Sequence, residues 1–358
     1  MNQEQYFRRL PKVDLHLHLA GTLQPRTLLD LARKNGVSLP TRDEDRIYRF
    51  RDFYDFLDML ERIARCIVSK GDFARVSYEA LRDAGAAGNL RYAEMFFNPQ
   101  YHYAHGIDYE TMVDGYIEGI EAAEREFGVV GRLIPSINRE LGPDAAVDMV
   151  RDLIENPRDR VIGLGMDCAE YKGKPHLFAE AYRMARRAGL RCTAHVCEDN
   201  QTLEQAPPSH VIDCIEILGC DRLDHGYNML ADPAVVGRCR DCGIPCTVCS
   251  HTCVASRLRT RWDNISRMHE GGLSLVVCTD DPPMFGTDIG QAYVTVCEEL
   301  RMSPAEAADL SLAGIDATWL SNDEKRGMRR RFKAEIDVLM AALDSSSEGS
   351  ARQEASRA

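Results

Sequence analysis

The segment Lys12-Val-Asp-Leu-His-Leu-His-Leu19 decides the fold class, because it predicts a buried strand and half of a metal site at once. Its apolar side chains alternate with polar ones, Asp14, His16 and His18. Side chains along a strand alternate with a period of two, so both imidazoles point to the same face. Two histidines on one face at the end of a strand are typical of a zinc site that other strands complete.

Further short apolar runs along the chain have the length and composition of strands. With the first they number eight: Val13–Leu19, Leu90–Phe97, Gly131–Ile137, Val161–Met166, Arg191–His195, Arg222–Asp224, Pro245–Cys249 and Leu273–Thr279. Helical spacing of apolar residues follows several of them, as in Asp144–Glu155, His176–Ala188 and Pro208–Leu218. Strands that alternate with helices predict a parallel sheet, and eight such units predict a (β/α)8 TIM barrel.

One metal-dependent barrel domain is expected over residues 1–343. The segment from Gln24 to about Asp83 is helical and longer than one crossover, which predicts additional helices near the N-terminus. Its apolar stripe, Phe53 to Leu60, suits either a cap over the barrel or an ordinary outer helix, and the pattern does not separate the two. The polar, small-residue tail 344–358 is expected to be disordered.

The bulk composition excludes several classes of protein. The 358 residues carry a formal net charge of −12, which disfavours nucleic-acid binding because phosphates attract a basic surface. No apolar run is long enough to span a membrane, and the N-terminus has no signal-peptide pattern. We therefore expect a cytoplasmic protein whose 13 cysteines are mostly reduced thiols. The sequence does not indicate an oligomeric state.

Other strand ends carry the remaining parts of a metal site: His195, His225 and Asp280 each follow an apolar run. Catalytic groups of a (β/α)8 barrel lie at the carboxyl ends of different strands. Imidazole nitrogen and carboxylate oxygen suit zinc, which keeps one position open for water in a catalytic site. Glu198, three residues after His195, is the candidate acid or base beside it.

Four phrases, in this order, resemble the adenosine deaminase family of the amidohydrolase superfamily. They are His16-Leu-His18 with Gly21-Thr22, Ala194-His195-x-x-Glu198, Asp224-His225-Gly226 and Thr279-Asp280-Asp281-Pro282. The resemblance implies a single zinc ion per chain. It implies the ligands His16, His18, His195 and Asp280.

The resemblance also implies three catalytic roles. Glu198 is expected to protonate the purine N1, His225 to orient or deprotonate the attacking water, and Asp281 to hydrogen-bond the purine ring. Hydrolytic deamination needs these parts independently of the likeness, since it requires hydroxide at neutral pH and a proton for a ring nitrogen.

Two phrases are similar to the adenine deaminase branch: Glu94-Met-Phe-Phe-Asn-Pro-Gln100 and Met166-Asp-Cys-Ala-Glu170. They predict substrate contacts from Phe97, Asp167 and Cys168. The expected function is zinc-dependent hydrolysis of a 6-aminopurine, adenosine or adenine, to the 6-oxopurine and ammonia. A pterin, aminodeoxyfutalosine or an N6-substituted purine is the alternative substrate, and a non-catalytic purine-binding or metal-binding barrel is the alternative class.

Departures from the family pattern fall at Cys197 and at Cys249–Cys253, where they are expected to line the pocket. The pairs Cys239–Cys242 and Cys246–Cys249 match the C-x2-C spacing of structural zinc. Only three residues separate them, and 245–249 also matches a buried strand, which favours cysteine as a small apolar residue.

Overall fold

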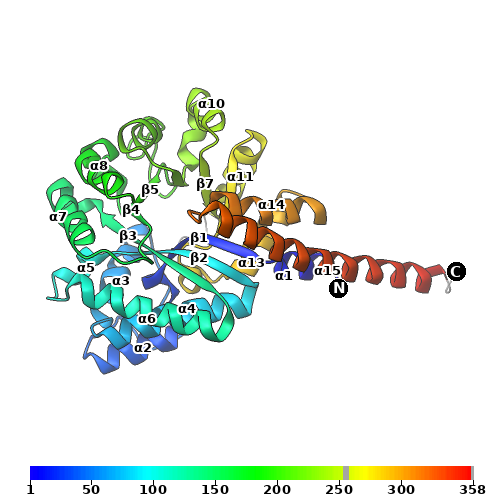
Figure 1. Ribbon diagram of the computed structural model, residues 1–358, viewed down its shortest axis with the longest axis horizontal. Helices are drawn as coiled ribbons and strands as arrows, with labels where there is room; N and C mark the ends of the chain where they lie inside the picture. Colours follow the sequence, from blue (N-terminus) through cyan, green and yellow to red (C-terminus); the bar gives the residue numbers. More distant parts are fainter. Residues whose placement is uncertain (253–257, 356–358) are drawn as a thin grey trace.

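Eight parallel strands form one sheet in the order β1 to β8 in the computed structural model, which describes residues 1–252 and 258–355 (Figure 1). The strands are β1 (Lys12–His18), β2 (Leu90–Phe97), β3 (Val130–Asn138), β4 (Gly163–Asp167), β5 (Arg191–Val196), β6 (Arg222–His225), β7 (Pro245–Cys249) and β8 (Ser274–Cys278). Backbone hydrogen bonds from Asp280 to His16 and from His18 to Asp280 join the last strand to the first. The predicted (β/α)8 TIM barrel is therefore confirmed.

Helices surround the barrel. The α-helices are α1 (Gln3–Arg9), α2 (Pro25–Lys34), α3 (Phe53–Cys66), α4 (Lys70–Gly88), α5 (Pro99–Tyr103), α6 (Tyr109–Phe127), α7 (Gly142–Glu155), α8 (Ala179–Arg187), α9 (Ser209–Ile212), α10 (Pro233–Cys242), α11 (Leu258–Glu270), α12 (Pro282–Phe285), α13 (Ile289–Glu299), α14 (Pro304–Ala317) and α15 (Asn322–Ala355). Short 3₁₀ or π turns are η1 (Leu19–Thr22), η2 (Arg139–Leu141), η3 (Glu170–Lys172), η4 (Pro175–Phe178), η5 (Asp213–Leu218) and η6 (Tyr227–Ala231).

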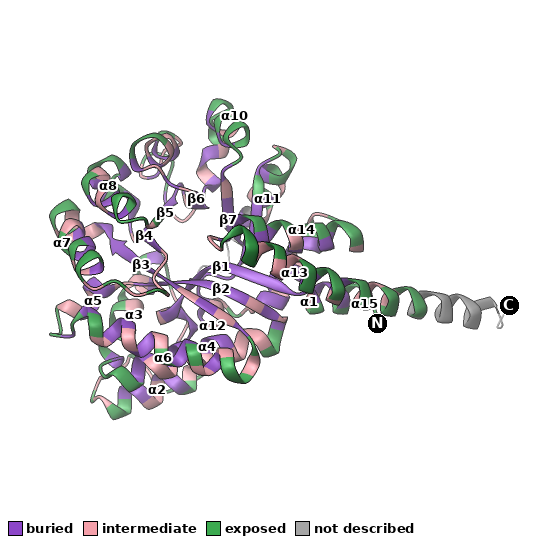
Figure 2. Ribbon diagram, viewed as in Figure 1, coloured by how far each residue is buried: buried purple, intermediate pink, exposed green. Residues whose placement is uncertain are grey.

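The core lies in the barrel and between the barrel and its helices, as the burial colours of Figure 2 show. Every residue of β1 is buried, which fits a strand that packs on both faces. The helices carry one buried face and one exposed face. None of the helices in the described part of the chain is long and apolar enough to cross a membrane.

The segment between β1 and β2 contains both kinds of helix that its sequence allows, an outer helix and a cap over the barrel. Helix α4 is an ordinary outer helix packed along α6, where Gly115 and Gly119 permit close approach. A Cβ atom at Gly119 would lie 2.0 Å from the carbonyl oxygen of Ala74. Helix α3 instead turns its apolar side chains toward the mouth of the barrel. Asp52 starts α3 as its N-cap by accepting from two backbone N–H groups.

The C-terminal segment differs from the expected disordered tail. Helix α15 continues to Ala355 and projects away from the barrel (Figure 1). Residues 344–355 contain no proline, and extending an existing helix costs much less than nucleating one, so a small polar sequence continues it.

Candidate metal and catalytic site

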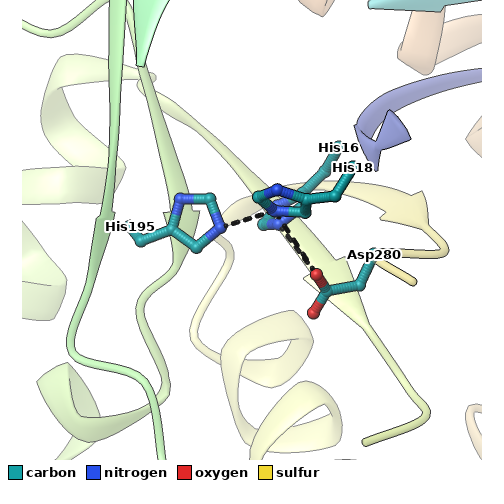
Figure 3. Close-up of side chains that lie close together, drawn as sticks. All are labelled: His16, His18, His195 and Asp280. Atoms are coloured by element: carbon teal, nitrogen blue, oxygen red, sulfur yellow. Dashed lines mark hydrogen bonds and ion pairs between the residues drawn. The ribbon is translucent and has the colours of Figure 1, made fainter. Parts of the chain in front are cut away.

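Three imidazoles and one carboxylate meet at the carboxyl end of the barrel (Figure 3). The Nε2 atoms of His18 and His195 lie 3.0 Å apart. Oδ1 of Asp280 lies 3.5 Å from Nε2 of His16 and 3.5 Å from Nε2 of His18. Strand β1 supplies two of these residues, β5 supplies His195, and the turn after β8 supplies Asp280.

The geometry of this cluster fits a zinc ion. Four ligands at about 2.0–2.1 Å from a tetrahedral centre lie about 3.3 Å from one another, close to the spacings observed here. The buried Nε2 atom of His16 has no hydrogen-bond partner among the described residues. A buried polar atom without a hydrogen-bond partner destabilises the folded protein unless a ligand binds it. The unpaired Nε2 of His16 therefore indicates that this cluster is a metal site.

The charges of the four groups suit a cation. Burial lowers the pKa of His195 well below its usual value and also lowers the pKa of His18, so both imidazoles are neutral and have a free electron pair. Burial would lower the pKa of His16, but Asp280 beside it raises that pKa, and His16 in turn holds the pKa of Asp280 well below its usual range against the effect of burial. Neutral imidazoles with one carboxylate are the protonation states that bind a metal.

A buried aspartate orients two of the imidazoles from behind. Nδ1 of His16 lies 2.8 Å from the hydroxyl of Thr247, which donates to Oδ1 of Asp224 at 2.9 Å. The hydroxyl of Thr193 donates to Oδ2 of Asp224 at 2.8 Å, and Nδ1 of His195 lies 3.6 Å from the same oxygen. The hydrogen bond to Thr247 fixes the rotation of the His16 ring and leaves its Nε2 facing the metal position, whereas Nδ1 of His195 faces Asp224 without a hydrogen bond.

Glu198, His225 and Asp281 lie beside the cluster and line the same pocket. Nε2 of His225 is 3.7 Å from Oε1 of Glu198 and 3.8 Å from Oδ2 of Asp280. Burial lowers the pKa of His225 well below its usual value, so the ring is neutral and able to accept a proton. Burial raises the pKa of Glu198 to about 7, which suits an acid at neutral pH.

Asp281 has a buried oxygen, Oδ1, without a hydrogen-bond partner among the described residues. Burial, with the charge of Asp280, raises the pKa of Asp281 well above its usual value, so this carboxyl favours its protonated form. Gly21 makes room for it, because a Cβ atom at residue 21 would lie 1.6 Å from Oδ1. The glycine of the His16–Thr22 phrase therefore has a steric reason.

Left-handed backbone conformations recur at the strand ends that form the site. Cys168, Cys197, His225 and Asp280 have φ values of 70°, 53°, 71° and 66°. Non-glycine residues in this region cost about 1–2 kcal/mol each, and they collect where the surrounding structure holds a functional side chain in place.

The pocket has a polar floor and an apolar wall and opens to solvent. Asn98 donates to both oxygens of Asp167 at 2.8 Å, and the Tyr101 hydroxyl lies 3.3 Å from the Cys168 sulfur. Asp167 and Cys168 thus lie where the sequence places substrate contacts. The apolar wall consists of Phe53, Phe56, Leu57 and Leu60 of α3 with Phe285.

Phe97 does not lie where the sequence interpretation placed it. Its ring packs on Tyr109 and Tyr116 of α6, outside the barrel, and it is absent from the described pocket lining. Phe96 faces inward instead, with its ring 4.9 Å from that of His18. Adjacent strand residues point to opposite faces, and the inward parity of β2 belongs to Glu94 and Phe96.

The cysteines that differ from the family pattern occupy different positions relative to the pocket. The Cys197 sulfur turns toward the carbonyl of Pro207 and away from the pocket, which differs from the expectation. Cys249 lies near His16 and His225 beneath the cluster. Cys253 falls outside the described residues. No metal-binding group among the described side chains joins Cys239, Cys242 and Cys246, and all described cysteines are free thiols.

Four functional side chains were not singled out from the sequence: Asp224, Thr247, Glu170 and Arg261. Glu170 accepts from the backbone N–H of Cys197 at 2.8 Å and lies 2.6 Å from Nδ1 of His210. Arg261, on α11, donates to Glu198 at 2.8 Å. Asp224 and Glu170 lie in family-like motifs that drew attention to other residues, whereas Thr247 and Arg261 depend on contacts between distant segments, for which the sequence carries no local signal.

This fold and site define a class: a (β/α)8 barrel in which three histidines and an aspartate are close enough to hold a metal, with further titratable side chains lining the same pocket.

Comparison with known proteins gives the family. The adenosine deaminase family model matches residues 11–335. An adenine deaminase of Streptomyces coelicolor is 35% identical over 92% of this chain and 95% of its own. The chain belongs to the adenosine deaminase family, which confirms the resemblance seen in its motifs.

Solved structures agree. A zinc-bound amidohydrolase from Burkholderia ambifaria is 32% identical with a TM-score of 0.87, covering 96% of this chain and 94% of its own. An adenine deaminase from Arthrobacter aurescens is 30% identical with a TM-score of 0.82, covering 94% of this chain and 99% of its own.

Proposed function

We propose that this protein is a zinc-dependent deaminase that hydrolyses adenine to hypoxanthine and ammonia, with one zinc ion per chain. The single observation that carries the proposal is the convergence of the four-ligand cluster and Glu198 in one pocket. A barrel that only bound a metal or a purine would have no use for an acid beside the metal position. The adenine deaminases among its relatives support the choice of purine.

His16, His18, His195 and Asp280 would hold the zinc. When bound, the ion supplies a nucleophile at neutral pH by lowering the pKa of water. His225 is neutral and lies within 3.8 Å of Asp280, so its Nε2 is placed to accept a proton from the attacking water. Glu198 delivers a proton to N1 of the purine, which makes C6 more electrophilic while water adds and ammonia leaves.

Asp281, Asp167 and Cys168 would recognise the purine edge. A protonated Asp281 both donates and accepts, which allows a hydrogen bond to an unprotonated ring nitrogen. Asn98 holds the carboxylate of Asp167 by both oxygens, so this acceptor has a fixed direction.

The pocket favours a base without a sugar phosphate. Five apolar side chains from α3 and α12 form its wall, and neither lysine nor arginine is among its described lining residues. Among these described lining residues, a phosphate would find no cationic partner. A flat, uncharged base fits an apolar wall at little desolvation cost.

A substrate panel tests the proposal. Purified protein with zinc would be assayed for ammonia release from adenine, adenosine, N6-methyladenine, aminodeoxyfutalosine and a pterin. We expect the highest kcat/KM for adenine. If only the pterin is hydrolysed, the substrate class is wrong, and if none is hydrolysed by protein that contains metal, the enzyme assignment itself is wrong.

The proposal also covers the location of the protein, its partners and its metal content. We propose a cytoplasmic protein whose partner is the small aminopurine substrate, with no nucleic acid or membrane partner, in keeping with its acidic charge. Metal analysis of protein purified without chelators is expected to give one zinc per chain.

A further inference from the structure

Arg261 reaches Glu198 from a distant part of the chain. Its guanidinium lies in the interior, with 1% of the side chain exposed. Nη2 donates to Oε1 of Glu198 at 2.8 Å and to Oδ1 of Asp199 at 2.9 Å, while Nε donates to the same Asp199 oxygen at 3.1 Å. Nη1 donates to the carbonyl of His251 at 3.0 Å, so hydrogen bonds use all three nitrogens.

The hydrogen bonds of Arg261 have two roles. Asp199 accepts two of them and supplies the negative charge that a buried arginine needs. The bond to Glu198 is therefore additional to charge compensation, and it is the one that reaches a pocket residue. The ring of Tyr227, 5.1 Å from the guanidinium carbon, limits movement on another side.

A guanidinium has only donors, so the oxygen that it contacts must accept. Oε1 of Glu198 faces Nη2 and cannot carry the acidic proton toward it. Oε2 has no hydrogen-bond partner among the described residues and remains available to a substrate. The proton of the neutral acid consequently belongs on Oε2.

We propose that Arg261 is a positioning residue that fixes which oxygen of Glu198 delivers its proton to the purine. This proposal rests on the proposed function. The backbone end of Glu198 has an anchor of its own, since Glu170 binds the N–H of Cys197, whose φ is 53°. Arg261 holds the other end, so that rotation of the carboxyl group about its last bond is restricted.

The test is Arg261→Gln, assayed with adenine in the zinc-loaded enzyme. We expect kcat to fall by about 10- to 100-fold while KM changes less than about threefold, because misorientation of a catalytic group affects the reaction step more than binding. Zinc content should stay at one per chain. Arg261→Lys, which keeps a donor cation, should recover part of the lost kcat.

Arg267→Gln is the matched control, since Arg267 lies on the same helix but is exposed, and its guanidinium donates to the carbonyl of Leu230 at 3.4 Å and not to Glu198. Its kinetic constants should match those of the unmodified enzyme. Thermal unfolding of each variant separates loss of fold from loss of rate.

A double-mutant cycle decides whether Arg261 acts through Glu198. In a Glu198→Gln background, Arg261→Gln should change residual kcat by less than about threefold, because the proton transfer is already lost. An equal fold-loss in both backgrounds, loss of zinc, or unchanged kcat in Arg261→Gln would each overturn the proposal. If Arg261→Gln does not fold, Arg261→Lys replaces it in the cycle. Absence of adenine hydrolysis by the unmodified, zinc-loaded enzyme would instead reject the proposed function.

Discussion

The two ends of the barrel both bury charged side chains, but they do so in opposite ways. At the amino end, the carboxylate of Glu94 accepts from Arg222 at 2.6 Å, from the Tyr92 hydroxyl at 2.9 Å and from the backbone of Trp319 at 2.7 Å. At the carboxyl end, Nε2 of His16 and Oδ1 of Asp281 are buried without a hydrogen-bond partner in the described structure.

This difference separates a structural charge cluster from a functional one. Both strand ends are equally inaccessible to solvent, so burial alone does not identify the site. The carboxylate of Glu94 has its hydrogen bonds made within the protein, and the Arg222 guanidinium, two of whose nitrogens have no hydrogen-bond partner, lies over the ring of Trp319. Nε2 of His16 has no such partner and lies where the four candidate ligands meet. Substitutions should therefore affect activity at one end and stability at the other.

The largest effect is expected from His18→Ala. Removing one of four ligands should abolish zinc retention and reduce adenine deamination more than any other change considered, because the nucleophile depends on the ion. Metal analysis after gel filtration, with activity on the same sample, measures both. Retention of stoichiometric zinc would show that the ligand set is wrong.

Glu198→Gln should reduce kcat by about 10²- to 10⁴-fold, the usual contribution of a general acid. The amide keeps the shape and the acceptor oxygen but has no acidic proton, so fold and zinc content should be unchanged. Steady-state kinetics with adenine measures the loss. A decrease of less than tenfold would contradict the role assigned to this residue.

Thr247→Val removes the hydroxyl between His16 and Asp224 while preserving side-chain shape. Loss of such an outer partner typically weakens metal affinity by about 10- to 100-fold. Competition with a chelator of known zinc affinity measures the change. Thr193→Val is the control, because the Thr193 hydroxyl donates to the same aspartate and to the carbonyl of Arg222 rather than to an imidazole, and it should have the smaller effect. Equal effects would assign the role to Asp224 alone.

The pH dependence of kcat/KM should show an alkaline limb that reports Glu198. Burial raises the pKa of Glu198 to about 7, and Arg261 opposes that rise. The acid works only when protonated, so kcat/KM should fall about tenfold per pH unit above the pKa. A bound dication lowers this pKa further, which places the limb at or below about pH 7. An activity that rises through pH 8 would contradict an acid role.

The sequence predicted those parts of the fold and site that depend on local pattern. All eight strands were located, because each is a short apolar run, and the four candidate ligands were selected from their place at strand ends and from the family motifs. Phe97 was chosen over Phe96 although alternation with Glu94 would have selected the latter. Arg261 was missed for a different reason, since its contact with Glu198 spans 63 positions and no periodicity encodes it.

The smallest expected effect on activity comes from Glu94→Gln at the amino end. Breaking a buried ion pair leaves Arg222 without its carboxylate partner, which should reduce the free energy of unfolding by about 3–5 kcal/mol. Glu335→Gln is the control, since its partly exposed pair with Arg91 should contribute about 1 kcal/mol or less. Both variants should keep kcat and KM within about twofold where they are folded.

One contact joins the charged groups at the two ends of the barrel, so the two ends are not fully independent. Nε of Arg222 lies 3.9 Å from Oδ1 of Asp224, the aspartate behind His16 and His195. If Glu94→Gln lowers kcat or zinc affinity tenfold while the protein stays folded, Arg222 connects the two clusters through Asp224. Glu94 and Arg222 would then help to hold the metal ligands in place. The division between stability at one end and activity at the other would apply only to charged groups beyond Arg222.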